Sequence, residues 1–384
     1  MMLNFIKFKY MKLCKFITLI ILYHFNLFSQ QPAIYNTGDY ISYLQNKNIG
    51  LVVNHTSVLN NVHLVDSLLR LGFQVKTIFS PEHGFFGKED AGKFLSDGYY
   101  NDTISIVSLY GDNKKPQAKD LDKIDVLLFD IQDVGVRFYT YISTLHYVME
   151  ACADHNIKLI VLDRPNSHVN YIDGPVLEKD FSSFVGMHPV PIIYGMTIGE
   201  YAMMINGEEW TSKRCDLIVV SMHNYLRNSE YIFTIKPSPN LPNNQAIKLY
   251  PSLCLFEGTN VSVGRGTNFP FQHFGAPYFQ NTYSFKPISN FGSKHPKYEN
   301  ITCYGEDLRF YKSDKYEINL NWLINAYNIC PNKVDFFNSF FDKLAGTDDL
   351  RKQIVSGLSI EEIKQSWRHN LLDFQDIRQK YLIY

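Results

Sequence analysis

A glutamate on a tight turn is the residue of this sequence best suited to acid–base chemistry. Glu82 stands in the segment Ser80-Pro81-Glu82-His83-Gly84, directly after an apolar stretch and a proline. Cleavage of a glycosidic bond needs a proton for the leaving oxygen, and a partly desolvated glutamate can deliver one. His83 is an alternative proton carrier, with a carboxylate orienting it. The segment therefore favours hydrolytic chemistry on carbohydrates.

Most glycosidase mechanisms also require a second carboxylate. The candidates for that role are Asp130, Asp133, Asp163 and Glu257. We favour Asp133 because it follows a strand end in a glycine-containing loop, whereas Asp130 is better placed to cap backbone groups. Arg137 is a natural anchor for a carboxylate of the substrate or of the enzyme. The expected catalytic residues are therefore Glu82, His83 and Asp133.

The sequence lacks the motif spacing typical of dinucleotide-binding proteins, serine hydrolases and zinc sites. Gly264-x-Gly266 has no third glycine at the dinucleotide spacing and does not occupy the first βα turn. The chain contains no GxSxG elbow and no HExxH or CxxC pattern typical of zinc sites. His55, His83 and His188 could still form a metal site with acidic loop residues, which leaves a metal-dependent amidase or deacetylase as an alternative. We expect no cofactor and no metal.

Short apolar runs alternate with helical patterns over the first half of the chain. Strands are expected at 49–54, 73–79, 104–110, 125–130 and 157–163, and helices at 62–71 and 141–154. Near-continuous apolar strands separated by helices indicate a parallel sheet covered on both faces. The predicted fold is therefore α/β, with a Rossmann-like parallel-sheet domain.

Polar residues collect at the ends of five successive predicted strands, among them Asn54, Glu82, Tyr110, Asp133 and Asp163. A turn or a helix cap would explain any single one of these positions. Ligands of parallel sheets bind beyond the carboxyl ends of the strands, so recurrence at five ends favours a binding site.

The second half of the chain is richer in loops. The densest proline stretch spans 237–242, and we place a domain boundary near residue 247. The expected organisation is a Rossmann-like domain over 35–247 and a smaller α+β domain over 248–384. Further helices are expected at 198–205, 334–344, 349–356 and 360–372, with a strand at 217–221.

The first thirty residues resemble a signal peptide, because four lysines precede an apolar run over 16–28 that ends in polar residues. The run is short for a membrane span, which needs roughly 20 apolar residues, so we expect a periplasmic or secreted protein without stable membrane insertion. The chain has 37 Lys and Arg against 38 Asp and Glu, and removal of the leader leaves it mildly acidic. Nucleic acid is therefore not an expected partner. Five widely spaced cysteines follow the leader, so at least one is expected to lack a partner within the chain.

Several long motifs, in order along the chain, resemble those of the NamZ-type exo-β-N-acetylmuramidases, a family long carried as a domain of unknown function. They are GLVVNHTSV from Gly50, FSPEHGFFG from Phe79, SLYG from Ser108, DVLLFDIQDVGVRFYTYISTL from Asp125, VLDRPN from Val161, DGPVLE from Asp173, HPVPIIYGMTIGE from His188, PSPNLP from Pro237, YPSLCLFEGTNVSVGRGT from Tyr250 and FDKLAGTDDLRKQI from Phe341. The resemblance covers nearly everything from residue 48 to residue 372.

The resemblance implies a Rossmann-like domain, a smaller C-terminal domain and an active site in the cleft between them. It implies hydrolytic release of N-acetylmuramic acid from the non-reducing end of peptidoglycan fragments, with Glu82 as the catalytic glutamate. Cleft-lining candidates are Asn54, Arg137, Asn240, Glu257 and Arg265, to which the strand ends add Tyr110 and Asp163. An arginine would recognise the lactyl carboxylate of muramic acid well. A muropeptide-binding protein without catalytic activity is a further alternative.

Overall fold

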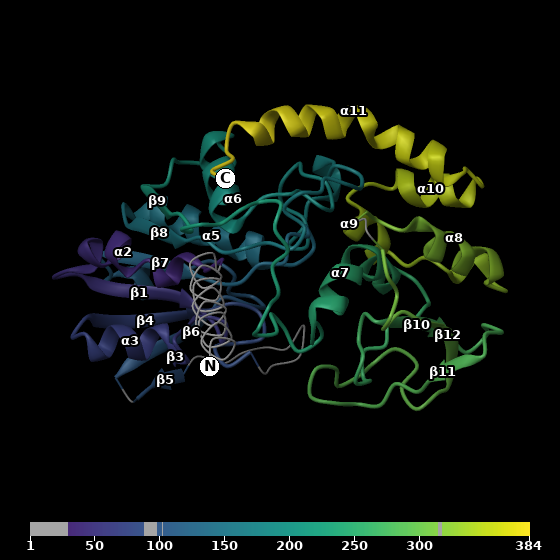
Figure 1. Ribbon diagram of the computed structural model, residues 1–384, viewed down its shortest axis with the longest axis horizontal. Coiled ribbons are helices and arrows are strands. Elements are labelled where there is room, and N and C mark those ends of the chain that lie inside the picture. Colours follow the sequence, from purple (N-terminus) through teal and green to yellow (C-terminus); the bar gives the residue numbers. More distant parts are fainter. Residues whose placement is uncertain (1–29, 88–97, 102, 314–316) are drawn as a thin grey trace, which may run out of the picture.

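The computed structural model describes residues 30–87, 98–101, 103–313 and 317–384, and the leader expected over residues 1–30 lies, apart from Gln30, outside them. The described chain forms an α/β domain that is followed by a smaller domain of helices and short strands (Figure 1). The expected fold class is thus confirmed.

A seven-stranded sheet forms the centre of the first domain. Its strands lie in the order β5-β6-β4-β1-β7-β8-β9, and neighbouring strands are parallel except for the antiparallel pair β5 and β6. They are β1 (Asn48–Val53), β4 (Gln74–Ser80), β5 (Gly98–Tyr100), β6 (Ile104–Ser108), β7 (Val126–Asp130), β8 (Lys158–Leu162) and β9 (Leu217–Val220). Because six strands run the same way, their carboxyl ends meet at one edge of the sheet.

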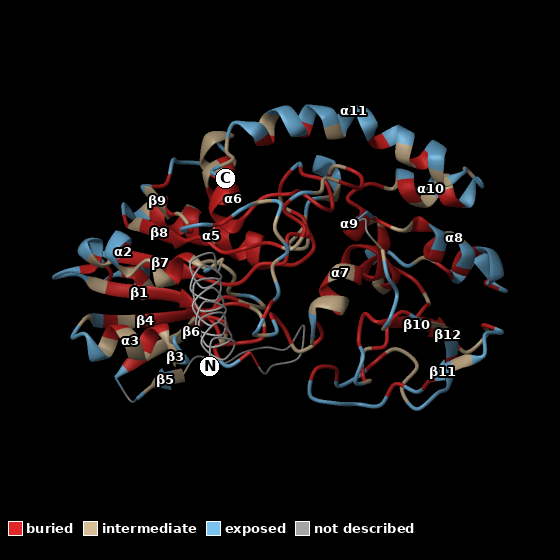
Figure 2. Cartoon of the chain, viewed as in Figure 1, coloured by how far each residue is buried: buried red, intermediate tan, exposed pale blue. Residues whose placement is uncertain are grey.

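Both faces of this sheet are covered, which explains the near-continuous apolar strands. Leu51 and Val52 of β1 point to opposite faces and both are fully buried. Leu51 packs in a cluster with α2 (Thr37–Leu44) and α3 (Leu64–Arg70), which the 3₁₀ turn η1 (Ala33–Tyr35) precedes. Val52 belongs to the cluster of α5 (Tyr141–His155) and α6 (Ile198–Gly207). Figure 2 shows the resulting buried strands between more exposed helices, as expected for a parallel sheet.

Helix ends in this domain carry recognisable signals. α5 ends at Asn156, which adopts the left-handed conformation with φ 55° and closes the last turn. α6 begins at Thr197 with a capping box, in which the Glu200 side chain accepts from the Thr197 backbone N–H. The short helix α4 (Ala118–Leu121) precedes β7, and the 3₁₀ turn η2 (Lys179–Phe181) lies in the loop-rich stretch before α6.

The second domain begins around α7 (Asn244–Leu253), so the boundary expected near residue 247 falls inside this helix. A small antiparallel sheet has the order β10-β12-β11. The remaining elements are η3 (Cys254–Gly258), β10 (His273–Ala276), β11 (Tyr283–Phe285), β12 (Cys303–Asp307), α8 (Leu320–Ile329), η4 (Lys333–Asp335), α9 (Phe340–Ala345), α10 (Asp349–Val355) and α11 (Ile360–Gln379). The apolar core of this domain is continuous with one face of the large sheet.

The last helix returns to the first domain. α11 runs from the end of α10 across to α6, near which the chain ends (Figure 1). The guanidinium of Arg378 donates to the carbonyls of Val169 and Gly195. The Tyr384 hydroxyl donates to Asp163 Oδ2 at 2.8 Å. The C-terminal segment therefore helps to hold the two domains together.

Two predicted helices differ from the structure. The helix expected at 62–71 begins only at Leu64, because the preceding residues form a short antiparallel pair, β2 (Val58–Leu59) and β3 (Val62–His63). Asn60 and Asn61 make its turn with positive φ angles of 50° and 64°, which suits asparagine. The helix expected at 334–344 is interrupted between η4 and α9, where the Asn338 side chain accepts from the Phe340 N–H and begins a new helix.

Two further properties concern membrane-spanning helices and the cysteines. In the described residues we find no helix with both the length and the apolar character to cross a membrane. Each of the five cysteines in the described ranges, Cys152, Cys215, Cys254, Cys303 and Cys330, is a buried free thiol.

Candidate active site

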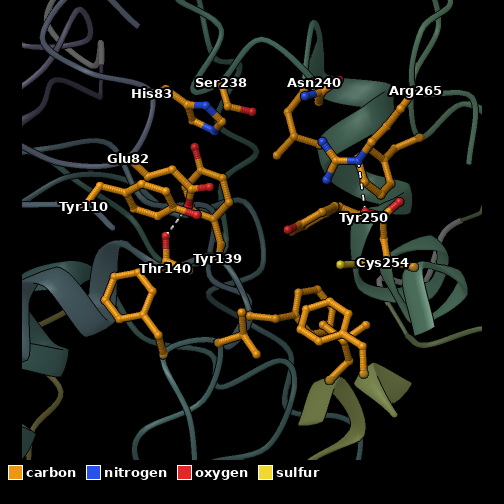
Figure 3. Close-up of a pocket in the computed structure, with 18 residues that line it drawn as sticks. Glu82, His83, Tyr110, Tyr139, Thr140, Ser238, Asn240, Tyr250, Cys254 and Arg265 are labelled. Atoms are coloured by element: carbon orange, nitrogen blue, oxygen red, sulfur yellow. Dashed lines mark hydrogen bonds and ion pairs between the residues drawn. The ribbon is translucent and has the colours of Figure 1, made fainter. Parts of the chain in front are cut away.

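A cavity of about 220 Å³ lies between the two domains. This volume is below the roughly 300–1,000 Å³ of pockets that hold drug-sized ligands, so it suits one sugar residue better than a long glycan. Figure 3 shows its polar side chains on two facing walls. Its lining residues are Glu82, His83, Tyr110, Phe138, Tyr139, Thr140, Phe184, Val185, Ser238, Asn240, Leu241, Tyr250, Cys254, Glu257, Arg265, Phe271, Phe340 and Leu344.

The turn after β4 carries the first wall. The turn is closed by a hydrogen bond of 3.0 Å from the Gly84 N–H to the Pro81 carbonyl. His83 and Gly84 both adopt positive φ angles, 69° and 72°. This conformation is uncommon for a residue other than glycine, and such strain is concentrated at functional sites. It places the side chains of Glu82 and His83 on the cavity.

The Glu82 side chain is held from a second loop. The Thr140 hydroxyl donates to Glu82 Oε2 at 2.6 Å, and Thr140 stands immediately before α5. Glu82 is half-buried and Thr140 is buried. The carboxyl group is therefore supported on one oxygen, while Figure 3 shows it at the edge of the cavity.

Two tyrosines stabilise this wall. The Tyr139 hydroxyl donates to the Pro237 carbonyl at 3.0 Å, and Asn54 Nδ2 donates to the Tyr141 hydroxyl at 3.0 Å. Burial raises the pKa of both Tyr139 and Tyr141, so both phenols remain neutral. Tyr139 lines the cavity, whereas Tyr141 and Asn54 lie behind it.

Arg265 lies on the opposite wall of the cavity, facing Glu82 (Figure 3). Its Nε donates to Glu257 Oε2 at 3.0 Å, and its guanidinium carbon lies 5.0 Å from the centre of the Phe271 ring. Burial lowers the pKa of Arg265, but Glu257 and neighbouring anionic groups outweigh this effect, and the net pKa is raised. Neither terminal amino group hydrogen-bonds any residue that the structure describes, and Figure 3 shows the guanidinium directed toward the cavity. It can therefore receive an anion.

The backbone around Arg265 fixes this arrangement. Gly264 and Gly266 have φ angles of 76° and 79°, and Phe271 adopts 56°. A left-handed conformation at a bulky aromatic residue is a genuine outlier. Asn240 lines the same cavity. Its Nδ2 donates to the Gly292 carbonyl at 2.7 Å, and this bond holds the side chain in place.

Six predicted site residues line the cavity: Glu82, His83, Tyr110, Asn240, Glu257 and Arg265. Tyr110 lies beside Phe184, with ring centres 6.1 Å apart. The other four predicted site residues, Asn54, Asp133, Arg137 and Asp163, are not among the residues that line this cavity.

Asp133 and Arg137 are structural in their contacts. Asp133 is buried, and its Oδ2 accepts hydrogen bonds from the Tyr194 hydroxyl and from the Gly135 N–H. Burial raises its pKa to about 6. Arg137 is completely buried, and burial lowers its pKa to about 9. Its guanidinium donates to four backbone carbonyls, those of Pro175, Val190, Leu344 and Ala345. Arg137 therefore joins the two domains behind the cavity.

Asn54 and Asp163 also satisfy groups of the protein itself. Asn54 Oδ1 accepts from the Thr56 N–H and hydroxyl. Asp163 accepts from the Thr197 hydroxyl, the Gly199 N–H and the Tyr384 hydroxyl, and burial raises its pKa to about 7. Both residues fix the ends of strands rather than reaching a ligand.

A metal site is not formed by the residues considered at the sequence level. Across the described ranges no group of three or more His, Cys, Asp or Glu side chains is arranged to hold a metal ion. His188 instead hydrogen-bonds His146 and the Tyr201 hydroxyl, each at 2.9 Å, and stacks on Trp210.

Family models match both domains of the chain. Exo-beta-N-acetylmuramidase NamZ, N-terminal, matches residues 49–245, and Exo-beta-N-acetylmuramidase NamZ, C-terminal, matches residues 248–384. This chain belongs to the NamZ exo-β-N-acetylmuramidase family.

Relatives in sequence and structure agree with membership of the NamZ family. The chain is 38% identical over 373 residues to the peptidoglycan β-N-acetylmuramidase NamZ of Bacillus subtilis (strain 168), a match that covers 90% of this chain and 89% of that protein. A crystal structure of a DUF1343 family protein from Bacteroides fragilis superimposes with a TM-score of 0.84 at 44% identity, covering 92% of this chain and 98% of the other. A second such protein from that organism gives 0.80 at 28% identity, with coverages of 93% and 99%.

Several cavity residues of this NamZ-family chain were missed at the sequence level. They are Phe138, Tyr139, Thr140, Ser238, Tyr250, Cys254 and Phe271, together with residues of the 184–185 loop and of α9. Most lie inside the long motifs that carry the family resemblance. Their position in those motifs was therefore the available signal, because aromatic and hydroxyl side chains otherwise suggest ordinary packing.

Proposed function

We propose that this chain is an exo-β-N-acetylmuramidase that releases N-acetylmuramic acid from the non-reducing end of peptidoglycan fragments. Its NamZ-family relative of Bacillus subtilis is a peptidoglycan β-N-acetylmuramidase. The observation that carries the proposal is the pairing, on facing walls of one small cavity, of the Glu82 carboxyl group with the Arg265 guanidinium. The first suits proton transfer and the second suits an anionic sugar.

We assign Glu82 as the proton donor to the glycosidic oxygen. As the bond between C1 and this oxygen breaks, the bonding electrons stay on the oxygen and the proton from Glu82 neutralises it, while the oxygen of a water molecule bonds to C1 and that water gives up one proton. The buried imidazole of His83 lines the same cavity and is the second proposed participant in proton transfer. Asp133 has no part in this proposal, because it does not line the cavity.

We assign Arg265 to the lactyl carboxylate, which distinguishes muramic acid from glucosamine. Its ion pair with Glu257 engages only Nε, so two parallel N–H donors stay available for a carboxylate. Glu257 therefore orients Arg265 in this proposal. Asn240 and Tyr110 are proposed to contact sugar hydroxyl groups from the rim.

We further propose that the protein is exported to the periplasm or secreted. The support is the sequence of residues 1–30, in which four lysines precede a short apolar run. Peptidoglycan is located outside the cytoplasmic membrane, so export would bring the enzyme to its substrate.

A direct test compares two chromogenic substrates, an N-acetylmuramide and the matching N-acetylglucosaminide. We expect release of the chromophore from the N-acetylmuramide and slow release from the N-acetylglucosaminide. Equal rates would contradict the role of Arg265 in selecting the sugar. Saturable binding of the N-acetylmuramide without release would contradict the enzymatic function and would favour a binding protein.

A further inference from the structure

Among the residues that the structure describes, Thr140 is the only hydrogen-bond partner of the Glu82 side chain. The Thr140 hydroxyl lies 2.6 Å from Glu82 Oε2 (Figure 3). Oε1 makes no hydrogen bond to the described residues and is not buried away from solvent. The two oxygens of the carboxyl group are therefore not equivalent.

Thr140 does not use its hydroxyl in the way its position predicts. It is the N-cap residue of α5, and threonine at this position usually accepts a hydrogen bond from a backbone N–H of the first turn. Here the Thr140 side chain makes no such bond. Its hydroxyl is committed to Glu82 instead of to the helix.

The Thr140 backbone is held firmly. Its carbonyl accepts from the N–H groups of Ser143 and Thr144, each at 3.0 Å. Three residues earlier, the Arg137 N–H donates to the Ile192 carbonyl at 2.8 Å. Thr140 itself is buried. It is therefore a fixed point from which the flexible Glu82 side chain can be oriented.

The electrostatic surroundings make this hydroxyl important for the charge on Glu82. The N-terminus of the fifteen-residue helix α5 carries partial positive charge, which favours a nearby carboxylate. Arg265 lies on the facing wall and forms its ion pair with Glu257, not with Glu82. The titratable groups that share the cavity with Glu82 are His83, Tyr110, Tyr139, Tyr250, Cys254, Glu257 and Arg265, and Tyr141 lies behind Tyr139.

We propose that Thr140 is a positioning residue that fixes Glu82 Oε2, so that Oε1 is the oxygen that delivers the proton to the glycosidic bond. When the proton leaves Oε1 and the bond between C1 and the glycosidic oxygen breaks, Glu82 becomes a carboxylate. The Thr140 hydroxyl stabilises this negative charge through Oε2 as it develops. This inference rests on the proposed function, because it assumes that Glu82 is the acid.

Thr140→Val tests the inference, because valine keeps the shape of threonine and removes the hydroxyl. We expect kcat on the chromogenic N-acetylmuramide to fall by about 10- to 100-fold, the loss of one hydrogen bond to a charged group, with KM changed less than about twofold. Because the Thr140 hydroxyl stabilises the ionised form of the acid, its loss should also move the high-pH limb of the rate profile toward higher pH.

Thr140→Ser and Thr144→Val are the matched controls. Thr140→Ser keeps the hydroxyl and should restore kcat to within about threefold of the parent. Thr144→Val removes a buried hydroxyl one turn along the same helix, where it reaches the Thr140 carbonyl rather than Glu82, and should leave the pH profile unchanged. Unfolding by urea, measured on all three variants, separates loss of rate from loss of fold.

The inference is overturned if folded Thr140→Val keeps the parent kcat and pH profile, or if Thr140→Ser is as slow as Thr140→Val. Should Thr140→Val fail to fold, the pH profile and kcat of Thr140→Ser and Thr140→Ala decide the same question. Failure of the proposed function would look different. In that case the parent enzyme would not cleave the N-acetylmuramide, or Glu82→Gln would cleave it as fast as the parent.

Discussion

The two walls of the cavity differ in what holds their functional groups. On the wall from the first domain, Glu82 is held by one neutral hydroxyl, that of Thr140. On the wall from the second domain, Arg265 is held by an ion pair with Glu257 and by the face of Phe271. The first arrangement lets a proton leave and return, whereas the second maintains a permanent charge. Under the proposed function, bond cleavage and recognition of the sugar are divided between the domains, and variants should separate them.

Glu82→Gln should have the largest effect on activity. The amide keeps the size of the side chain but cannot deliver a proton, and general acid catalysis contributes about 10²- to 10⁴-fold. We expect kcat to fall by roughly 10³-fold while KM changes little. Steady-state kinetics with the chromogenic N-acetylmuramide measure both. Unchanged turnover in a folded variant would contradict the role of Glu82 as the proton donor. It would then also contradict the assignment of bond cleavage to the wall from the first domain.

Arg137→Met should weaken the connection between the two domains behind the cavity. Methionine leaves four buried carbonyl groups without their donor, two in each domain. Each unsatisfied group costs about 1–3 kcal/mol, so the free energy of unfolding should fall by about 3 kcal/mol or more. Urea denaturation followed by fluorescence measures it. Arg309→Met, which breaks the surface pair with Asp307, is the control and should leave the free energy of unfolding nearly unchanged, because exposed ion pairs contribute little.

Arg265→Gln should change selectivity more than rate. Without the guanidinium the lactyl carboxylate loses charge-assisted hydrogen bonds, and KM for the N-acetylmuramide should rise by about 10- to 100-fold. The slow reaction with the N-acetylglucosaminide should be affected less than about threefold, because that substrate has no carboxylate. Competition between the two substrates gives the ratio directly. Equal losses on both would assign Arg265 to general stability of the cavity.

Asp133→Asn should have the smallest effect on catalysis, because Asp133 lies behind the cavity. We expect kcat within about threefold of the parent. Its stability should depend on pH, however. Burial raises the pKa of Asp133 from 3.8 to about 6, so the folded protein prefers the protonated acid, and this contribution is lost as the pH rises from about 4 through 6. Asparagine should therefore gain stability relative to aspartate between about pH 4 and pH 6, with little further change above that range, measured by thermal unfolding. A loss of kcat as large as that of Glu82→Gln would restore Asp133 as a catalytic carboxylate.

The sheet was predicted well from the sequence, because a parallel strand that is buried on both faces consists of a continuous run of apolar residues. Strand ends at Ser80 and Asp130 were expected within one residue, and this placed Glu82 correctly at the rim. The edge strand β5 (Gly98–Tyr100) was missed because it has only three residues, of which the middle one, Tyr99, is exposed, so it carries no such pattern. The strands of the second domain were missed because they are only three to five residues long, too short for a clear pattern.

The site was harder to predict, because a polar residue after a strand has the same appearance whether it bonds to a ligand or to the protein. Arg137 and Asp163 satisfy distant backbone groups that are more than 30 positions away, and no local pattern shows that pairing. Thr140 illustrates the opposite case, a cavity residue that was not predicted. A threonine before a helix is normally assigned to capping, so its bond to a residue 58 positions away could not be seen without coordinates.

The return of α11 to the first domain has a consequence for the order of folding. The hydrogen bond between Tyr384 and Asp163 joins residues 221 positions apart. Closing so long a loop costs only slightly more entropy than closing one half its length, yet contacts of this range slow the search for the native state. We therefore expect the large sheet to form before the C-terminal segment docks, and the docking of Arg378 and Tyr384 to be a late step in folding that joins the two domains around the cavity.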